Sequence, residues 1–200
     1  QECAEVLDCA VSQFSFEGGS SSCTVIACEA GLALLGGAAS TPESMATWVE
    51  SGVRSHGSLG VAGGIEHTNA GEVLPRIPSL AALRVLGVPL QGMLTNPQWF
   101  ESMIEQVHAT ANPSKMVGLV LTKPPESILV VLPSRTPPEA GYIIFDSHAR
   151  AHLGRDGAYA LRCSTAGAAA AALREIFPVV DLGGDEDLGV AGTEGEPEDI

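Results

Sequence analysis

The residue best placed for chemistry is Cys23, which stands where the Gly/Ser-rich stretch GGSSS at 18–22 meets an apolar run. The run over 23–35 ends at a Gly-Gly pair and predicts a buried helix that begins at Cys23. A helix N-terminus carries about half a positive charge and unpaired N–H groups, so it stabilises a thiolate and can hold an oxyanion. The placement is therefore typical of a cysteine nucleophile. The alternative is a small buried apolar residue, which most cysteines are.

A cysteine nucleophile needs an imidazole base, and the base needs an acid or amide that orients it. His148 follows the strand pattern GYIIF at 141–145 and comes two residues after Asp146. Residues i and i+2 of a strand point to the same side, so we expect Asp146 to reach the His148 ring and fix its tautomer. His152 is the alternative base, without a paired acid. We expect the other histidines to be solvated or on a polar helix stretch: His56, His67 and His108.

Gln13 lies ten residues before Cys23, just ahead of the Gly/Ser-rich stretch. Papain-like cysteine enzymes use an upstream Gln side-chain amide as an oxyanion donor, so Gln13 is a candidate for that role. The alternative is an ordinary exposed Gln. Cys28 lies inside the predicted helix, away from the free N–H groups, and is expected to be a core residue. No neighbouring pattern would activate the remaining thiols, Cys3, Cys9 and Cys163.

The elements around these residues follow from periodicity and turn residues. Thr41 and Pro42 mark the start of one helix, and Ser164 is the expected cap of the last. Residues 55–72 form a Gly-rich loop by composition. Helices are predicted at 23–35, 41–55, 79–86, 97–110 and 165–176, and strands at 116–122, 127–133, 141–146 and 159–163. Helices first, then an antiparallel sheet, then one closing helix indicate an α+β fold, with N-terminal helices packed on a C-terminal sheet.

The composition is that of a folded globular domain. Of the 200 residues 45% are apolar, and no run approaches the ~20 apolar residues that a membrane span needs. The net charge of −14 argues against nucleic acid and membranes as partners and would attract basic ones. Seven acids and no base fall within 185–200, so we divide the chain into one domain, 1–180, and an acidic, disordered tail or linker, 181–200.

The five cysteines are odd in number and include no C-x-x-C pair, which argues against a zinc site and a disulfide scaffold. We expect reduced thiols in an intracellular compartment, cytoplasmic or nuclear, and no metal or cofactor. The chain begins at Gln1 without the basic and apolar regions of a signal peptide. We therefore interpret it as a domain of a longer or processed protein.

Two stretches, SQFSFEGGSSSC at 12–23 and FDSH at 145–148, resemble the cysteine deubiquitinase domain of the herpesvirus large tegument protein and its tegument-like relatives outside viruses. The discriminating feature is the Asp that precedes the His, because most papain-like enzymes place the orienting residue after the histidine. The resemblance spans about residues 5–178. It implies a papain-like fold and a site in which the nucleophile, base, orienting acid and oxyanion donor are Cys23, His148, Asp146 and Gln13.

The resemblance also implies the reaction, which is hydrolysis of the bond after the C-terminal Gly-Gly of ubiquitin or a ubiquitin-like protein. Cys23 would attack, His148 would carry the proton, and water would release the acyl-enzyme. We further expect the Gly pairs at 18–19 and 63–64 to line a channel narrow enough to demand glycine in the substrate. An acidic body would suit the basic face of ubiquitin.

The residues leave three other interpretations open. The first is another papain-like cysteine peptidase or an acyltransferase, which would use the same residues on a different substrate. The second is a non-catalytic ubiquitin-binding module, whose usual sign would be a missing member of the Cys–His–Asp set, whereas all three are present. The third is a structural domain in which the pattern is a coincidence, and it predicts that Cys23 is no more reactive than Cys28.

Overall fold

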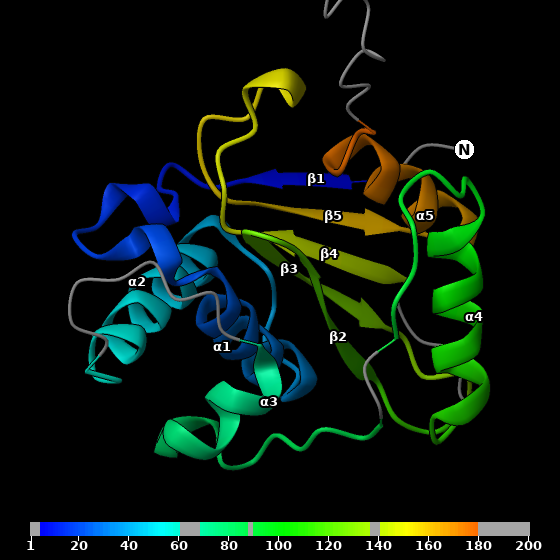
Figure 1. Cartoon of the computed structure of the whole chain (residues 1–200), viewed down its shortest axis with the longest axis horizontal. Helices are drawn as coiled ribbons and strands as arrows, with labels where there is room; N and C mark the ends of the chain where they lie inside the picture. The colour runs from blue at the N-terminus through cyan, green and yellow to red at the C-terminus, as the bar shows by residue number, and fades with distance from the viewer. Residues whose placement is uncertain (1–4, 61–68, 88–89, 137–140, 180–200) are drawn as a thin grey trace, which may run out of the picture.

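Five antiparallel strands form one sheet in the order β1-β5-β4-β3-β2 (Figure 1). The computed structural model describes residues 5–60, 69–87, 90–136 and 141–179. The strands within them are β1 (Glu5–Asp8), β2 (Val117–Lys123), β3 (Glu126–Leu132), β4 (Tyr142–Asp146) and β5 (Tyr159–Cys163). The last four confirm the predicted strands to within one residue at each end. A short hairpin turn joins β2 to β3, as the Pro-rich turn sequence predicts.

The edge strand β1 was not predicted. It has only four residues, with an acid at each end, so its composition does not favour a strand. It forms because it pairs with β5, which comes from far along the chain. Asp8 at its end also accepts two hydrogen bonds from Arg155. Since the partner strand lies about 150 residues away, no local pattern marks this pairing.

In the described part of the chain, five α-helices pack around the sheet: α1 (Cys23–Leu35), α2 (Pro42–Gly57), α3 (Ala70–Val73), α4 (Trp99–Thr110) and α5 (Ala166–Ile176). The bounds of α1 are those predicted from the apolar run. α2 begins as predicted, with Pro42 as its first residue and the Thr41 hydroxyl accepting a hydrogen bond from the Ser44 N–H. The predicted starts and ends of α4 and α5 agree within two residues.

Three local predictions were wrong. The cap of α5 is Thr165, whose hydroxyl accepts from the Ala168 N–H, rather than Ser164. The predicted helix at 79–86 is only a single 3₁₀ turn, η4 (Pro78–Leu80), followed by turn and coil. Within the predicted Gly-rich loop at 55–72, the end of α2 and the start of α3 are helical, the latter capped by Asn69. In each case a cap or turn that involves only a few residues sets where the helix begins or ends.

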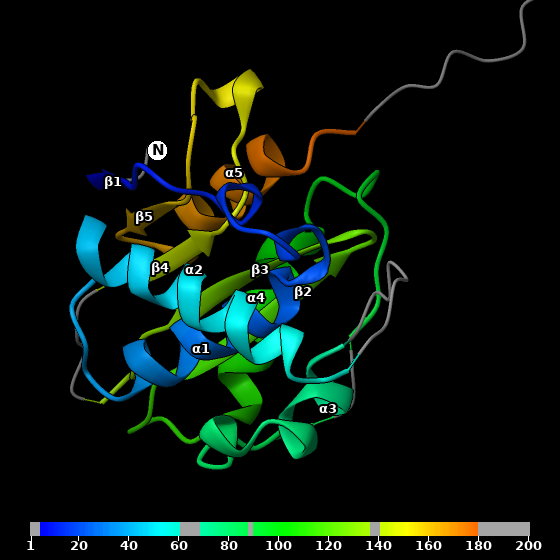
Figure 2. The ribbon, with the colours of Figure 1, turned by 90° about the vertical axis from the view of Figure 1, so that its left-hand side faces the viewer.

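Helices cover both faces of the sheet, and the pleat of β3 divides the core between them (Figures 1 and 2). Leu129 and Val131 pack with α1 and α2 on one face, whereas Ile128, Val130 and Leu132 pack with α4 and α5 on the other. The prediction that N-terminal helices pack on the sheet is confirmed for α1 and α2. The arrangement as a whole agrees with the predicted α+β class.

α1 is the central helix, which explains why its sequence is apolar on all sides. Ile26 and Ala30 face the sheet and α2, whereas Val25 and Cys28 face a smaller cluster built by α3 and the 3₁₀ turns after it. α2 packs directly against α1 at Gly52, where a Cβ would lie 2.5 Å from Ile26 Cγ1. This packing holds the first residue of α1, Cys23, at a fixed place beside the β2–β3 turn.

The predicted acidic tail, 181–200, lies outside the described residues. Among the helices that the structure does describe, none is both long and apolar enough to cross a membrane.

Candidate active site

Cys23 is the first residue of α1 and is almost fully buried, at 4% exposure. The chain reaches it through two 3₁₀ turns, η1 (Gln13–Ser15) and η2 (Gly19–Ser21). A Cβ at Gly19 would collide with the carbonyl oxygen of Gln13, so only glycine lets η2 fold back onto η1. Gly19 is therefore needed for packing, a role that differs from the expected one of lining a substrate channel. The other predicted channel residues, Gly63 and Gly64, lie outside the described residues.

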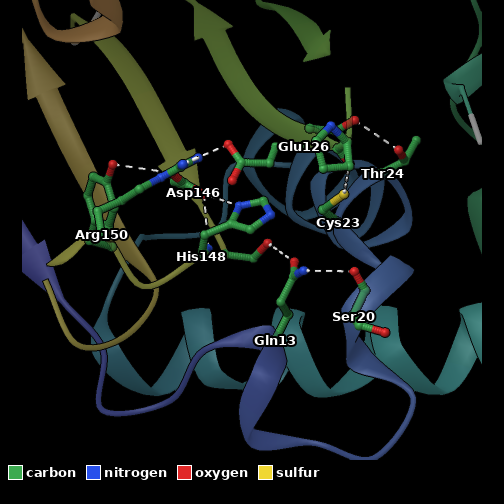
Figure 3. Close-up of polar contacts among 12 residues, drawn as sticks. Gln13, Ser20, Cys23, Thr24, Glu126, Asp146, His148 and Arg150 are labelled. Atoms are coloured by element: carbon green, nitrogen blue, oxygen red, sulfur yellow. Dashed lines mark hydrogen bonds and ion pairs between the residues drawn. The ribbon is translucent and has the colours of Figure 1, made fainter. Parts of the chain in front are cut away.

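Asp146 and His148 form the close pair that the sequence predicts (Figure 3). Asp146 Oδ1 accepts from the His148 ring at Nδ1, 2.6 Å away, and from the His148 backbone N–H at 2.9 Å. The reason differs from the predicted one, because Asp146 ends β4 and His148 lies beyond the strand. The carboxylate bonds the backbone two residues on, which is the geometry of an Asx turn rather than strand alternation.

The other oxygen of Asp146 has two partners that sequence reasoning missed. Oδ2 accepts from Arg150 Nε at 2.7 Å and from the Tyr159 hydroxyl at 3.2 Å. Arg150 also donates through Nη1 to Glu126 at 2.7 Å. The carboxylate of Asp146 is 0% exposed, so these donors replace the water it has lost. No local signal marks Arg150 or Tyr159, since both reach Asp146 only once β4, β5 and the loop between them have folded.

These contacts set the charges of the site. Burial opposes ionisation of Asp146, but the hydrogen bond and charge of His148 and the charge of Arg150 hold the pKa of the carboxyl below its usual range. Burial also favours a neutral His148, yet its hydrogen bonds to Asp146 and Cys23 and their charges raise its pKa to about 9. His148 is therefore a protonated imidazolium at neutral pH.

The His148 ring lies between Asp146 and Cys23 (Figure 3). Burial raises the pKa of the Cys23 thiol, but the hydrogen bond and positive charge of His148 outweigh it and lower the pKa overall. The backbone N–H groups of Ser127 and Thr24 add to this lowering. In the thiol form Cys23 donates to the carbonyl oxygen of Pro125, 3.7 Å away, on the β2–β3 turn. The site thus supports a thiolate–imidazolium pair, the reactive form of a cysteine nucleophile.

Gln13 is brought to the same place and is 1% exposed, so the alternative of an ordinary exposed Gln is wrong. Its side-chain Oε1 accepts from the Ser147 hydroxyl at 2.8 Å, and its Nε2 faces the Ser20 carbonyl oxygen at 3.5 Å. The amide points into the space between Ser20 and His148, beside the start of α1 (Figure 3). All four residues that the sequence selects therefore meet, from η1, α1 and the end of β4.

The other cysteines differ from Cys23. Cys28, on the same helix, has its pKa raised to about 12 by burial and by the charge of Glu29, as expected of a core residue. Cys9 is buried and free. The expectation that every thiol is reduced is wrong for Cys163, which is disulfide-bonded. Cys3 lies outside the described residues.

The other histidines do not approach the Cys23 site through any contact that the structure describes. His56 was expected to be solvated, but it is buried and burial lowers its pKa. His108 packs against Tyr142, and burial lowers its pKa as well. His152, the alternative base, bonds the Glu175 carbonyl oxygen of α5. His67 lies outside the described residues. In the described ranges, no three His, Cys, Asp or Glu side chains are placed to hold a metal ion.

Comparison with known proteins assigns no family, since no family model matches the chain and no curated protein matches it. The candidate site therefore stands on its own geometry. That geometry is a cysteine whose pKa the neighbouring His148 lowers, a buried acid bonded to His148, and the Gln13 amide near the start of α1. This set can carry out nucleophilic acyl transfer.

The lowered pKa of Cys23 predicts selective alkylation. At pH 7 iodoacetamide should modify Cys23 at a rate on the order of 100-fold above that of Cys28, whose pKa of about 12 keeps it protonated. The Cys23 rate should fall only below its lowered pKa, and His148→Ala should move that fall to higher pH. Peptide mass spectrometry over a pH series measures both rates in one sample. Equal rates for the two cysteines, or an unchanged profile in His148→Ala, would contradict the assigned charges.

A second prediction concerns Arg150. Arg150→Met removes one of the two cationic partners of the buried Asp146 carboxylate and leaves Oδ2 without its charged donor, so we expect a loss of about 3–5 kcal/mol in the free energy of unfolding. Arg155→Met is the matched control, because it breaks an Arg–Asp pair whose Asp8 side chain is 60% exposed, and should cost about 1 kcal/mol or less. Urea unfolding at pH 7 measures both variants. A loss for Arg150→Met no larger than that of the control would mean that Asp146 does not depend on Arg150.

Proposed function

We propose that this chain is a thiol-dependent deubiquitinase with a papain-like fold, which hydrolyses the bond after the C-terminal glycine of ubiquitin or a ubiquitin-like protein. The observation that carries the proposal is the meeting of Cys23, His148, Asp146 and Gln13 in one site. These are the four positions that the resemblance to the tegument deubiquitinases selects. Gln13 and Cys23 both lie more than a hundred residues from Asp146 and His148, so their convergence is not a consequence of local sequence.

The proposed reaction has two halves. The Cys23 thiolate attacks the carbonyl carbon of the substrate's last glycine, a C–S bond forms, and the electron pair of the C=O moves onto oxygen. Gln13 Nε2 and the first N–H groups of α1 stabilise that oxyanion. When the intermediate collapses, the C–N bond breaks and the His148 imidazolium protonates the leaving amine. His148 then takes a proton from water, which attacks the thioester, releases the carboxylic acid and regenerates the charged pair.

The burial of the site favours a substrate that has no bulky side chain next to the reacting carbonyl. Cys23 and His148 are each only 4% exposed, so a bulky side chain next to the reacting carbonyl would meet protein before the thiolate. Glycine has no side chain, and ubiquitin ends in Gly-Gly. The net charge of −14 further suits a basic partner such as the basic face of ubiquitin.

We also propose an intracellular setting, in which ubiquitin conjugates and a reduced Cys23 are both available. Cys9, Cys23 and Cys28 are free, as such a setting requires. Cys163, by contrast, is disulfide-bonded.

Ubiquitin carrying a C-terminal electrophile tests the proposal. The native protein should form a covalent adduct of one ubiquitin, seen as a mass shift on a denaturing gel and by mass spectrometry. Cys23→Ala should form none, whereas the matched control Cys28→Ala should react like the native protein, because Cys28 is a core thiol with a raised pKa.

Other outcomes separate the alternatives. A Cys23 that reacts with iodoacetamide but with no ubiquitin or ubiquitin-like probe would replace the deubiquitinase by another cysteine peptidase or an acyltransferase. Ubiquitin bound without an adduct would favour the non-catalytic binding module. A Cys23 inert to every reagent would leave only the structural role.

A further inference from the structure

Ser147 is the residue between the acid and the base, and the structure ties it to Gln13 by two hydrogen bonds. Its hydroxyl donates to Gln13 Oε1 at 2.8 Å, and its carbonyl oxygen accepts from the Gln13 backbone N–H at 3.0 Å. The two residues are 134 positions apart in the chain. Ser147 is 2% exposed and Gln13 1%, so water does not compete for these bonds.

These contacts fix the orientation of the Gln13 amide, with Oε1 toward Ser147 and Nε2 toward Ser20. The Ser20 carbonyl oxygen, 3.5 Å from the amide, can only accept a hydrogen bond, so the NH₂ group must be on that side. The Ser147 hydroxyl is then the donor to Oε1. An NH₂ group has two N–H donors, and Ser20 O is the only acceptor within hydrogen-bond range of Nε2 among the described residues. One N–H is therefore left to face a substrate oxyanion.

Loss of the Ser147 hydroxyl would remove the hydrogen bond that fixes the orientation of the Gln13 amide. The Oε1 acceptor would be buried without a donor, which disfavours the observed orientation. Rotation of the amide by 180° would then turn Oε1, rather than an N–H, toward the place where the oxyanion forms. An oxygen lone pair there repels the developing negative charge instead of stabilising it.

We propose that Ser147 is a positioning residue that orients the Gln13 amide for oxyanion binding, an inference that rests on the proposed function. The tripeptide 146–148 then includes or positions each group that assists Cys23. Asp146 holds the base, Ser147 holds the oxyanion donor, and His148 is the base. One short segment at the end of β4 thus aligns the Gln13 turn with the thiolate.

The test compares Ser147→Ala, Gln13→Ala and the double variant in hydrolysis of ubiquitin aminomethylcoumarin and of p-nitrophenyl acetate. Gln13→Ala should lower kcat by about 100-fold or more, as loss of an oxyanion donor does. Ser147→Ala should lower kcat by about 10-fold to 100-fold with little change in KM, since a misplaced group costs on this scale. The double variant should be no slower than Gln13→Ala, because Ser147 acts through Gln13.

Two controls separate positioning from general damage. Ser40→Ala also removes a buried hydroxyl, one that accepts from Arg162 at 3.3 Å, and should leave kcat unchanged. Alkylation of Cys23 by iodoacetamide forms no oxyanion, so Ser147→Ala should keep the native rate. In the native protein, the side-chain NH₂ protons of Gln13 should exchange slowly with solvent by NMR, a readout that needs no variant.

The inference is overturned if Ser147→Ala hydrolyses at the native rate a substrate that Gln13→Ala hydrolyses slowly, or if the two single losses multiply in the double variant. Rapid exchange of the Gln13 amide protons would overturn it as well. If the native protein cleaves the ester but not the ubiquitin substrate, the deubiquitinase proposal fails, while the ester rates still decide the role of Ser147.

Discussion

The buried carboxylate of Asp146 is the constraint on which the rest of the site depends. It is 0% exposed and accepts four hydrogen bonds, two from His148 and one each from Arg150 and Tyr159. A buried charge without such partners would be protonated or would destabilise the fold. Its donors come from β5 and from the chain after β4, and Arg150 extends the network to Glu126 at the start of β3. The ion pairs therefore join β4 to β3 through Arg150, and the Tyr159 hydrogen bond adds β5.

The site is reactive because Cys23 lies next to His148, which this network holds in place. Cys23 and Cys28 lie five residues apart on α1, and both are buried, yet their pKa values shift in opposite directions. Burial raises both. The difference arises because His148 and the backbone N–H groups of Ser127 and Thr24 lower the pKa of Cys23, whereas the charge of Glu29 raises that of Cys28 further. The helix start and the buried acid are thus two separate requirements, and the fold meets them at the same point.

Much of this could be predicted from the sequence, because the signals were local. The apolar run bounded by glycines gave the limits of α1, and the Asp-x-His spacing gave the pair that orients the base. What was missed depends on contacts that form only in the folded chain. β1 forms only against β5, Arg150 and Tyr159 reach Asp146 only in the folded chain, and Ser147 meets Gln13 across most of the sequence. The predicted reason for the Asp146–His148 contact was also wrong, since a turn geometry, not strand alternation, brings them together.

The charge of His148 is the most direct test of this account. In protein labelled with ¹⁵N-histidine, NMR follows the two ring nitrogens of His148 through a pH titration. We expect both to be protonated at pH 7, with loss of the proton near pH 9, and a fall of that pKa in Asp146→Asn. A His148 ring that is neutral at pH 7, with a pKa at or below about 6.5, would contradict the thiolate–imidazolium pair.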